Sequence, residues 1–489
     1  MKFRFFSLAK LSKNHLLQIS LIVLVSFIVR LYRIDYPLLD WHSFRQADTA
    51  SVTLRYTQEG IDLLRPKYHD LSNIQSGQDN PKGYRMTEFP LINGLIAVFL
   101  RALPQLDLVQ FSRFISIVFS LGTLVTLYWL VKQIANHQLA LLSAVFFGLL
   151  PYSIYYSRVI LPEPFMLFFV TASMAFWVAF LKDKKLLFWW LSWILLALSL
   201  LLKPFTAFLG PVFLSLLISY DKHFYKKPTS YLFPVLVFIP LFLWRHWIQQ
   251  FPEGIPASDW LYNANQIRLR PAWFRWLFWE RLTKLMAGFT GVIFGFSNLF
   301  KRDKLFYILI SWWLGILIFF IVIATGNVQH DYYQVLILPC LSLTLARGVL
   351  LFYKHAIKFL AKKTRQAKKL SLILVTALSF SIFLLSWLQV KGFFNVNQWE
   401  YHKAGIEANL LLPKNAKVIA PAMGDTMFLF QTQRNGWPIG GEINHKIQLG
   451  ATHYITTNFD QEMHELEANY NTVKKTSEYI IIDLTTPKK

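Results

Sequence analysis

Long apolar stretches, separated by short polar connectors, fill the chain from its start to about residue 390. A helix needs roughly 20 apolar residues to cross a membrane, and sometimes only about 17. The pattern predicts a polytopic all-α membrane protein with about 11 transmembrane helices. We expect these helices at residues 16–34, 111–131, 139–155, 165–181, 186–202, 205–220, 231–247, 285–300, 305–324, 333–353 and 370–390. The stretch 89–103 is shorter, and we expect it to be interfacial or re-entrant.

Lysine and arginine residues gather in the connectors that would face one side of the membrane. The positive-inside rule describes this distribution for cytoplasmic connectors. A full span at 89–103 would move all later connectors to the other side and would break the rule. The pattern therefore predicts a cytoplasmic N-terminus, retained as part of the first span. The basic positions are the N-terminus, Lys132 and residues 182–185, 222–227, 301–304 and 354–369.

The pattern changes after residue 390, where short apolar runs alternate with polar ones. It predicts helices at 399–412, 426–432 and 460–470, and strands at 417–421, 454–457 and 478–483. Strands that alternate with helices indicate an α/β fold. We therefore expect a membrane domain at residues 1–390 and a small soluble α/β domain at 391–489, outside the cytoplasm.

Composition agrees with this division and narrows the function. Hydrophobic residues make up 54% of the chain and charged residues 16%, whereas soluble domains have about 25% charged residues. The net charge of +23 is accounted for by the connectors, so it does not indicate nucleic acid, and no nucleic-acid motif is present. A single cysteine, Cys340, excludes an intramolecular disulfide and a metal site built from several cysteines.

The first predicted outer loop opens with ionisable side chains directly after a span, in the sequence "LLDWHSFRQADTASVTLR". An S-x-x-Q pattern that starts at Ser43 resembles a capping box and predicts a helix from there. Asp40 and His42 then precede the helix, while Arg45 and Asp48 share one of its faces. The structural alternative is a solvated amphipathic helix on the membrane surface.

Further candidates on the same side stand where a predicted span or helix begins or ends. Each has a structural explanation: Glu88 precedes a helix that starts with proline, Lys203 can extend along the span toward water, and His330 can cap a helix. Ionisable groups that gather near a bilayer are nevertheless costly and usually mark function. The set is Glu88, Arg158, Glu163, Lys203, His330 and Tyr333.

The order and spacing of these residues, over about 16–353, resemble the GT-C superfamily of integral-membrane glycosyltransferases. The protein O-mannosyltransferases and the aminoarabinose transferase ArnT are the most similar branch. That family has an acidic residue just after the first span and an E/H-x-P-L motif that opens a later helix. The matching positions are Asp40, Glu88-Phe89-Pro90-Leu91, Arg158 with Glu163, Leu202-Lys203-Pro204, and the segment from Tyr332 to Pro339.

The resemblance implies transfer of a sugar from a polyprenyl-phosphate donor to a lipid, glycan or protein acceptor, with inversion, on the outer side of the membrane. Asp40 is then the general base, and Asp48 and Glu88 are the other catalytic candidates. The donor and acceptor would be held by Arg45, Arg158, Glu163, Lys203, His330 and Tyr333. An apolar groove between spans would hold the prenyl tail, and the aromatic-rich segment 271–284 is a candidate amphipathic lid.

Two positions depart from the family pattern. Trp41 follows Asp40 where the family often has an Asp-Glu pair, and Phe89 follows Glu88 where ArnT-like relatives have a basic residue. The choice between Asp40 and Asp48 as base therefore stays open. No cofactor is certain, and a divalent metal ion would use Glu88 and His330.

Two other classes of function are compatible with the sequence. An O-antigen ligase or polymerase would have large, arginine-rich outer loops late in the chain. A transporter or flippase would have broken helices with charges at mid-membrane, or inverted repeats. The absence of an N-x-S/T sequon in the outer loops favours a bacterial plasma membrane as the location.

Overall fold

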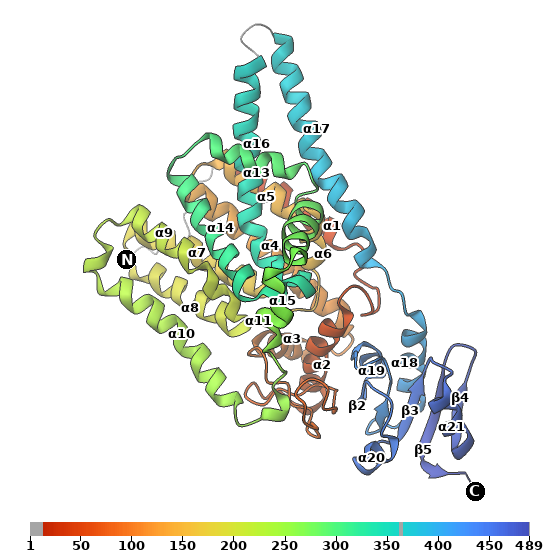
Figure 1. Cartoon of the computed structure of the whole chain (residues 1–489). Helices are drawn as coiled ribbons and strands as arrows, with labels where there is room; N and C mark the ends of the chain where they lie inside the picture. The colour runs from red at the N-terminus through yellow and green to blue at the C-terminus, as the bar shows by residue number, and fades with distance from the viewer. Residues whose placement is uncertain (1–12, 361–364, 489) are drawn as a thin grey trace.

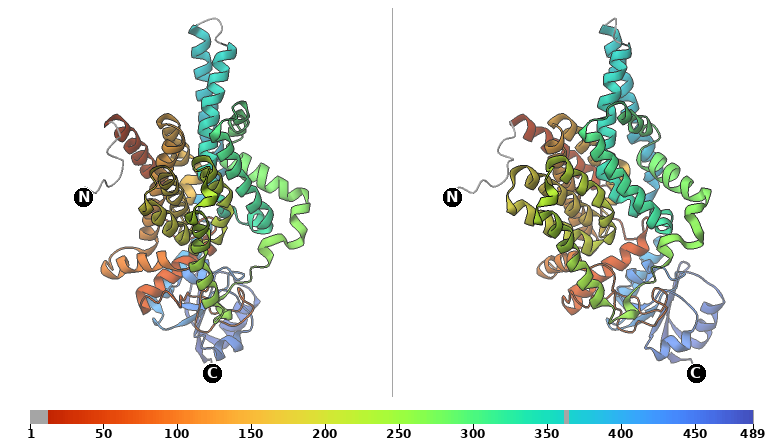
Figure 2. Two further views of the ribbon diagram at one scale, coloured as in Figure 1. Left: turned by 90° about the vertical axis from the view of Figure 1, so that its left-hand side faces the viewer. Right: turned by 60° about the vertical axis from the view of Figure 1, so that its left-hand side comes forward.

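The computed structural model describes residues 13–360 and 365–488. A body of helices carries a small sheet domain at one end, and the hairpin of α16 (Leu338–Leu360) and α17 (Arg365–Val390) projects from the opposite end (Figures 1 and 2). Residues 1–12, which include most of the predicted basic N-terminus, lie outside the described residues, as do residues 361–364 of the basic run 354–369.

All the predicted spans fall on helices. Six helices among the described residues are long and apolar enough to cross a membrane, and six shorter apolar helices accompany them. This supports a polytopic helical fold, while the number of 11 spans stays a prediction. The helices of the body are α1 (Lys13–Arg30), α4 (Leu108–Ile134), α5 (His137–Leu149), α7 (Glu163–Asp183), α8 (Leu186–Leu202), α9 (Gly210–Tyr220), α10 (Pro228–Ile248), α13 (Gly291–Ser297), α14 (Lys304–Val322), α16 (Leu338–Leu360) and α17 (Arg365–Val390).

Helix α7 is the centre of the body and packs against α4 and α8. Small side chains let these helices approach one another, as is common in membrane proteins. The Ser173 hydroxyl donates to the Ser192 carbonyl of α8 at 2.7 Å. The helix is apolar almost all round, and neighbouring helices accordingly bury it on every side.

Four predicted spans are interrupted near the end that the charge pattern assigns to the outer side, and the span 285–300 is broken by a turn at residues 287–290. Proline lacks the backbone N–H that would continue a helix. Pro151 starts the separate short helix α6 (Pro151–Tyr156), and Pro204 starts η2 (Pro204–Leu209) before α9. Another interrupted span begins as η8 (Asp331–Ile337) before α16. The periodicity of apolar residues continues through each break, so it could not reveal them.

Basic connectors meet at one end of the body. Lys184 pairs with Asp221 at 3.2 Å, and Lys304 lies 3.3 Å from the ring centre of Tyr220. These contacts join three of the connectors that the charge pattern assigns to the same side.

Shorter elements gather at the other end, beside the sheet domain. Helix α3 has 12 residues, about 18 Å at 1.5 Å per residue, too short to span a membrane. The elements are α2 (Ser43–Glu59), α3 (Leu91–Ala102), α11 (Trp260–Asn263), η5 (Ala264–Leu269), α12 (Pro271–Phe274), the π-helix η6 (Arg275–Met286) and α15 (Ala324–Gln329).

A five-stranded sheet with the order β2-β1-β3-β5-β4 forms the C-terminal domain. Strand β1 pairs in parallel with β2 and β3, and β5 pairs antiparallel with β3 and β4. Along β5, Ile480 and Ile482 join the core on one face and Ile481 joins the other. The elements are α18 (Trp399–Leu411), β1 (Lys417–Ile419), α19 (Met427–Gln431), β2 (Asn435–Trp437), α20 (Ile443–Gln448), β3 (His453–Thr456), α21 (Gln461–Asn469), β4 (Tyr470–Lys475) and β5 (Ile480–Pro487).

The first outer loop extends the edge of this sheet. The Gly436 amide in β2 donates to the His69 carbonyl at 2.9 Å, and the Leu71 amide donates to the Gly436 carbonyl at 2.8 Å. A Cβ at Gly436 would overlap the Val418 carbonyl oxygen of β1, so only glycine fits there. The loop and the C-terminal domain are therefore joined through their backbones.

Candidate active site

The turn before α2 sets the geometry of the first outer loop. His42 has φ 54° and ψ 35°, a left-handed conformation that is uncommon for residues other than glycine. Helix α2 begins at Ser43, as the sequence predicts, but the predicted capping box does not form. The Ser43 hydroxyl lies 3.0 Å from Met427 Sδ. The Gln46 amide instead donates to Asp40 Oδ1 at 2.9 Å, which holds the turn against the helix.

Asp40 lies in a closed ion cluster beneath this turn. Its Oδ2 is 2.6 Å from Arg158 Nη2 and 3.4 Å from Arg113 Nη2, and its side chain is 1% exposed. Arg158 also donates to the Arg33 carbonyl at 2.5 Å. Neither Asp40 nor Arg158 is open to a ligand in this arrangement. Their roles as base and as phosphate contact stay predictions, and each requires the cluster to open.

Asp48 connects the first outer loop to the C-terminal domain. Its carboxylate lies 2.9 Å from Arg85 Nη2 and accepts hydrogen bonds from the Gln75 amide at 3.2 Å and the Thr426 hydroxyl at 2.8 Å. The side chain is buried. These contacts place Asp48 between two parts of the chain, and its role as an alternative base stays a prediction.

Two ion pairs form a more open part of the site. Arg45 Nη2 lies 2.5 Å from Glu88 Oε1, and the Glu88 side chain is 13% exposed. Lys203 Nζ lies 3.2 Å from Glu163 Oε1. The candidates Arg45, Glu88, Glu163 and Lys203, which are far apart in the sequence, are brought together here.

The charges of these pairs act on one another. Burial alone would raise the pKa of Glu88, but the nearby charges of Arg45 and Lys203 outweigh burial and hold that pKa well below its ordinary value. Burial opposes the charge of Arg45, but the charges of Glu88 and Asp48 raise its pKa above the ordinary value. Both groups are therefore ionised, and the cations can accept another anion when one enters.

Aromatic rings stand beside these pairs. Lys203 Nζ lies 5.5 Å from the ring centre of Tyr333, and the ring of His330 stacks on Tyr332 with centroids 5.1 Å apart. Burial lowers the pKa of His330 to about 3, so its imidazole is neutral at pH 7. His330 and Tyr333 thus lie in the same region as the cations, as the sequence predicts.

Asp331 is a site residue that sequence reasoning did not select. Its carboxylate lies 2.6 Å from His42 Nε2 and 3.1 Å from Arg281 Nη1, and accepts from Trp41 Nε1 at 3.1 Å and from the Tyr156 hydroxyl. The side chain is fully buried. An ionisable residue at the edge of an apolar stretch was the available signal.

The segment predicted as an amphipathic lid lies over this position. Residues 271–284 form α12 and most of η6, and Arg281 of η6 reaches Asp331. Trp276 and Trp279 on the same element are exposed. The segment therefore has one anchor inside the site and aromatic side chains on its outer surface.

The residues suggested for a divalent metal do not form a donor set. No group of three or more His, Cys, Asp or Glu side chains converges in the part of the chain that the structure describes. Glu88 is bound to Arg45 instead, and no contact joins it to His330 within the described residues. We therefore assign no step to a metal ion.

Comparison with known proteins gives a family match over part of the chain and a fold. Residues 92–247 match the family model of dolichyl-phosphate-mannose-protein mannosyltransferases. A comparison with curated protein sequences gives no match.

Solved structures of ArnT and of an archaeal oligosaccharyltransferase resemble the chain. ArnT from Cupriavidus metallidurans bound to undecaprenyl phosphate matches with a TM-score of 0.64 at 11% identity, over 95% of this chain and 97% of ArnT. The oligosaccharyltransferase AglB from Archaeoglobus fulgidus, in complex with an inhibitory peptide and a dolichol-phosphate, matches with a TM-score of 0.58 at 10% identity, over 91% of this chain and 69% of AglB. A second structure of the Archaeoglobus fulgidus enzyme, with zinc and sulfate, gives a TM-score of 0.56 at 10% identity, over 89% of this chain and 68% of that one.

Proposed function

We propose that the chain, which shares the fold of ArnT and matches a protein-mannosyltransferase family model over residues 92–247, transfers a sugar from a polyprenyl-phosphate donor to an acceptor. The reaction takes place on the outer side of the membrane and inverts the anomeric carbon. The acceptor is a lipid, a glycan or a protein.

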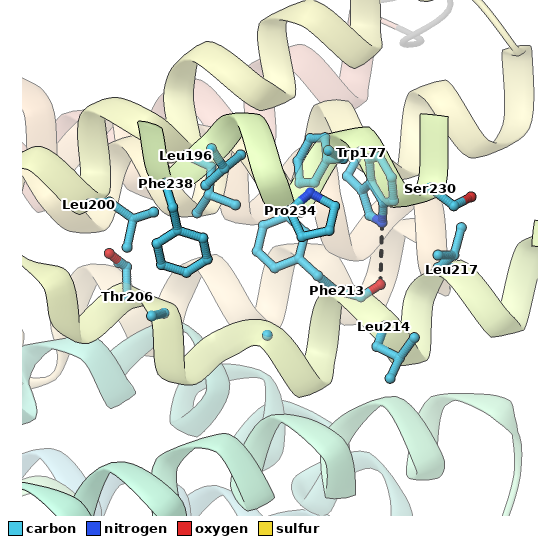
Figure 3. A pocket seen from close by; sticks show the side chains of 14 residues that line it. Trp177, Leu196, Leu200, Thr206, Phe213, Leu214, Leu217, Ser230, Pro234 and Phe238 are labelled. Carbon is cyan, nitrogen blue, oxygen red and sulfur yellow. Dashed lines mark hydrogen bonds between the residues drawn. The ribbon is translucent and has the colours of Figure 1, made fainter. Parts of the chain in front are cut away.

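An apolar cavity among the predicted spans is the observation that carries this proposal. It has a volume of about 250 Å³ and lies between α7, α8, α9 and α10, lined by residues such as Trp177, Leu200 and Phe238 (Figure 3). Thr206 lies at one end, and its hydroxyl donates to the Lys203 carbonyl at 2.7 Å. A prenyl tail in this cavity would therefore end beside the Lys203 side of the ion pairs.

The paired cations suit the phosphate of such a donor. Lys203 and Arg45 are each held by one carboxylate, and their side chains are 11% and 9% exposed. When a phosphodiester enters between them, its oxygens replace these carboxylates as the partners of the two cations. As the bond from the sugar to the phosphate breaks, the same cations stabilise the charge that develops on the leaving oxygen.

The proposal is tested by the turnover of labelled polyprenyl-phosphate sugars in membranes. Gly210 borders the cavity, and a Cβ there meets no atom within 4 Å. Gly210→Leu should fill the cavity and raise KM for long-chain donors about tenfold, because about four apolar carbon atoms take the space of the tail. Gly295→Leu is the matched control, since Gly295 also has open space and lies in α13.

Three results contradict the proposal. Wild-type protein that consumes no donor over a panel of sugars would favour a transporter. If Gly210→Leu leaves KM unchanged, the prenyl tail does not bind in this cavity. An equal rise in KM for Gly295→Leu would show a general effect of added bulk.

A further inference from the structure

His42 is held in an unusual way for a loop residue. Its backbone is in the left-handed region, and its Nε2 lies 2.6 Å from the fully buried carboxylate of Asp331. Nδ1 has no hydrogen-bond partner among the residues that the structure describes. The side chain is 11% exposed. One nitrogen is thus fixed from inside the protein, while the other is open to accept a proton.

Each candidate carboxylate of the outer site is already neutralised by a cation. Asp40 is bound by Arg158 and Arg113, Asp48 by Arg85, and Glu88 by Arg45. A carboxylate held by a guanidinium group is a weak proton acceptor, because the cation stabilises its charged form. The imidazole of His42 is held by a carboxylate instead of by a cation, and its Nδ1 is an acceptor atom.

A series of aromatic rings separates His42 from Lys203. The ring of His42 is 5.0 Å from Tyr332 and 5.9 Å from His330, between centroids. The ring of His330 is in turn 5.6 Å from Tyr333, which contacts Lys203. An inverting displacement needs its base on the face of the sugar opposite the leaving group. Glu88, bound directly to Arg45, is on the leaving-group side.

We propose that His42 is the general base of the transfer and that Asp331 is the residue that orients it. The inference rests on the proposed function. A lone pair of the acceptor hydroxyl or amine forms the bond to the anomeric carbon, while the bond from that carbon to the phosphate oxygen breaks and its electrons go to the phosphate. The acceptor proton moves to His42 Nδ1. Asp331 stabilises the resulting imidazolium through Nε2–H, and the proton then leaves to solvent.

The charged and titratable groups around His42 come from four elements. Asp331 and Tyr332 lie on η8, with His330 directly before them. Tyr156 of α6 and Arg281 of η6 bind the carboxylate of Asp331. Arg281 binds Oδ2 while His42 binds Oδ1, so the arginine fixes the carboxylate without displacing the imidazole. The fourth element, α2, contributes Arg45.

The test compares pH–rate profiles of full-length variants, with donor binding measured separately. His42→Asn is suitable because asparagine accepts the left-handed backbone conformation well. We expect kcat to fall by about 10²–10⁴, donor binding to remain, and the acidic limb of the profile to disappear. Asp331→Asn should lower kcat and shift that limb. Added imidazole should restore part of the turnover of His42→Gly.

The control is His464→Asn, which changes an exposed histidine of α21 and should alter neither kcat nor the pH profile. A His42→Asn enzyme with kcat within about threefold of wild type, or with an unchanged acidic limb, overturns the assignment. Loss of the acidic limb in Asp40→Asn alone would also overturn it. Wild-type protein without turnover contradicts the proposed function itself, so the two failures are distinguishable.

Discussion

Asp40 has more charged partners than its place in a loop suggests. Two guanidinium groups and an amide surround it, and its side chain is almost completely removed from solvent. Burying one carboxylate between two arginines fixes the turn that presents His42. At the scale of single residues, the acidic position after the first span is therefore well placed to organise the site.

Asp40→Asn should destabilise the protein by about 3 kcal/mol, because it leaves Arg158 and Arg113 buried without a counter-charge. Removing the charge of one arginine as well, in Asp40→Asn with Arg158→Gln, should recover part of that stability. Thermal unfolding and turnover are measured together. Asp107→Asn is the matched control, since Asp107 caps α4 and asparagine caps equally well.

The outcome separates two roles of Asp40. If it organises the turn, the double variant should regain some turnover along with its stability. Recovery of stability without any turnover would instead support Asp40 as the base that the sequence predicts. Unchanged stability in the single variant would contradict the account of the ion cluster.

The sequence identified the candidate site residues, but it did not identify the residues with which they form ion pairs. Asp40, Glu88 and Lys203 stood out because each lies where a predicted span or helix begins or ends. Arg113, 73 residues from Asp40, lies inside the predicted span 111–131, but nothing in the sequence connected it with Asp40. Spacing along the chain shows only neighbours on one helix, whereas the pairs in this site join separate elements.

At the scale of helices and strands, too, the sequence predicted some elements and missed others. Apolar length predicted the spans, and alternation predicted β1, β3 and β5. Strand β2 has only three residues, with a glycine at its centre, and β4 is a polar edge strand. Neither has the alternation that marks a half-buried strand, because β2 is completed by tertiary contacts and β4 faces solvent.

The stability with which the first outer loop docks on β2 should depend on pH. Burial raises the pKa of Asp70 to about 7, so the docked loop holds a proton that an undocked loop loses near pH 4. Docking is therefore strongest below about pH 4 and weakens as pH rises toward about 7, by about 4 kcal/mol in total. His69, whose pKa burial lowers to about 4, has the opposite effect between about pH 4 and 6.5.

Asp70→Asn isolates the aspartate part of this dependence. Hydrogen exchange of the peptide that contains Gly436 should be alike in variant and wild type near pH 4 and slower in the variant above pH 7. The exposed Asp259→Asn serves as control. Equal exchange in variant and wild type at every pH would contradict the buried, protonated state of Asp70.

At the scale of the whole molecule, the site is assembled from distant parts of the chain. The first outer loop, the turn at Lys203 and the segment at Asp331 meet under the C-terminal domain, while basic connectors meet at the other end. We expect these two ends to face opposite sides of the membrane.

Sidedness can be measured by cysteine labelling, since the one native cysteine, Cys340, is buried. Thr472→Cys on β4 should react with a membrane-impermeant maleimide in intact cells. Lys226→Cys in the basic connector should react only after permeabilisation. Both positions are exposed. The unmodified protein is the control, and labelling of both variants from the same side would contradict the predicted topology.

The pairing of residues 69–71 with Gly436 has a consequence for how the protein is made. A ribosome releases the first outer loop early and the strand that binds it almost last. During synthesis the loop is present before β2, and Asp48 still lacks the hydrogen bond from the Thr426 hydroxyl. A nascent chain that has not yet reached β2 thus lacks these contacts, so we expect its site to become complete only once β2 has been synthesised.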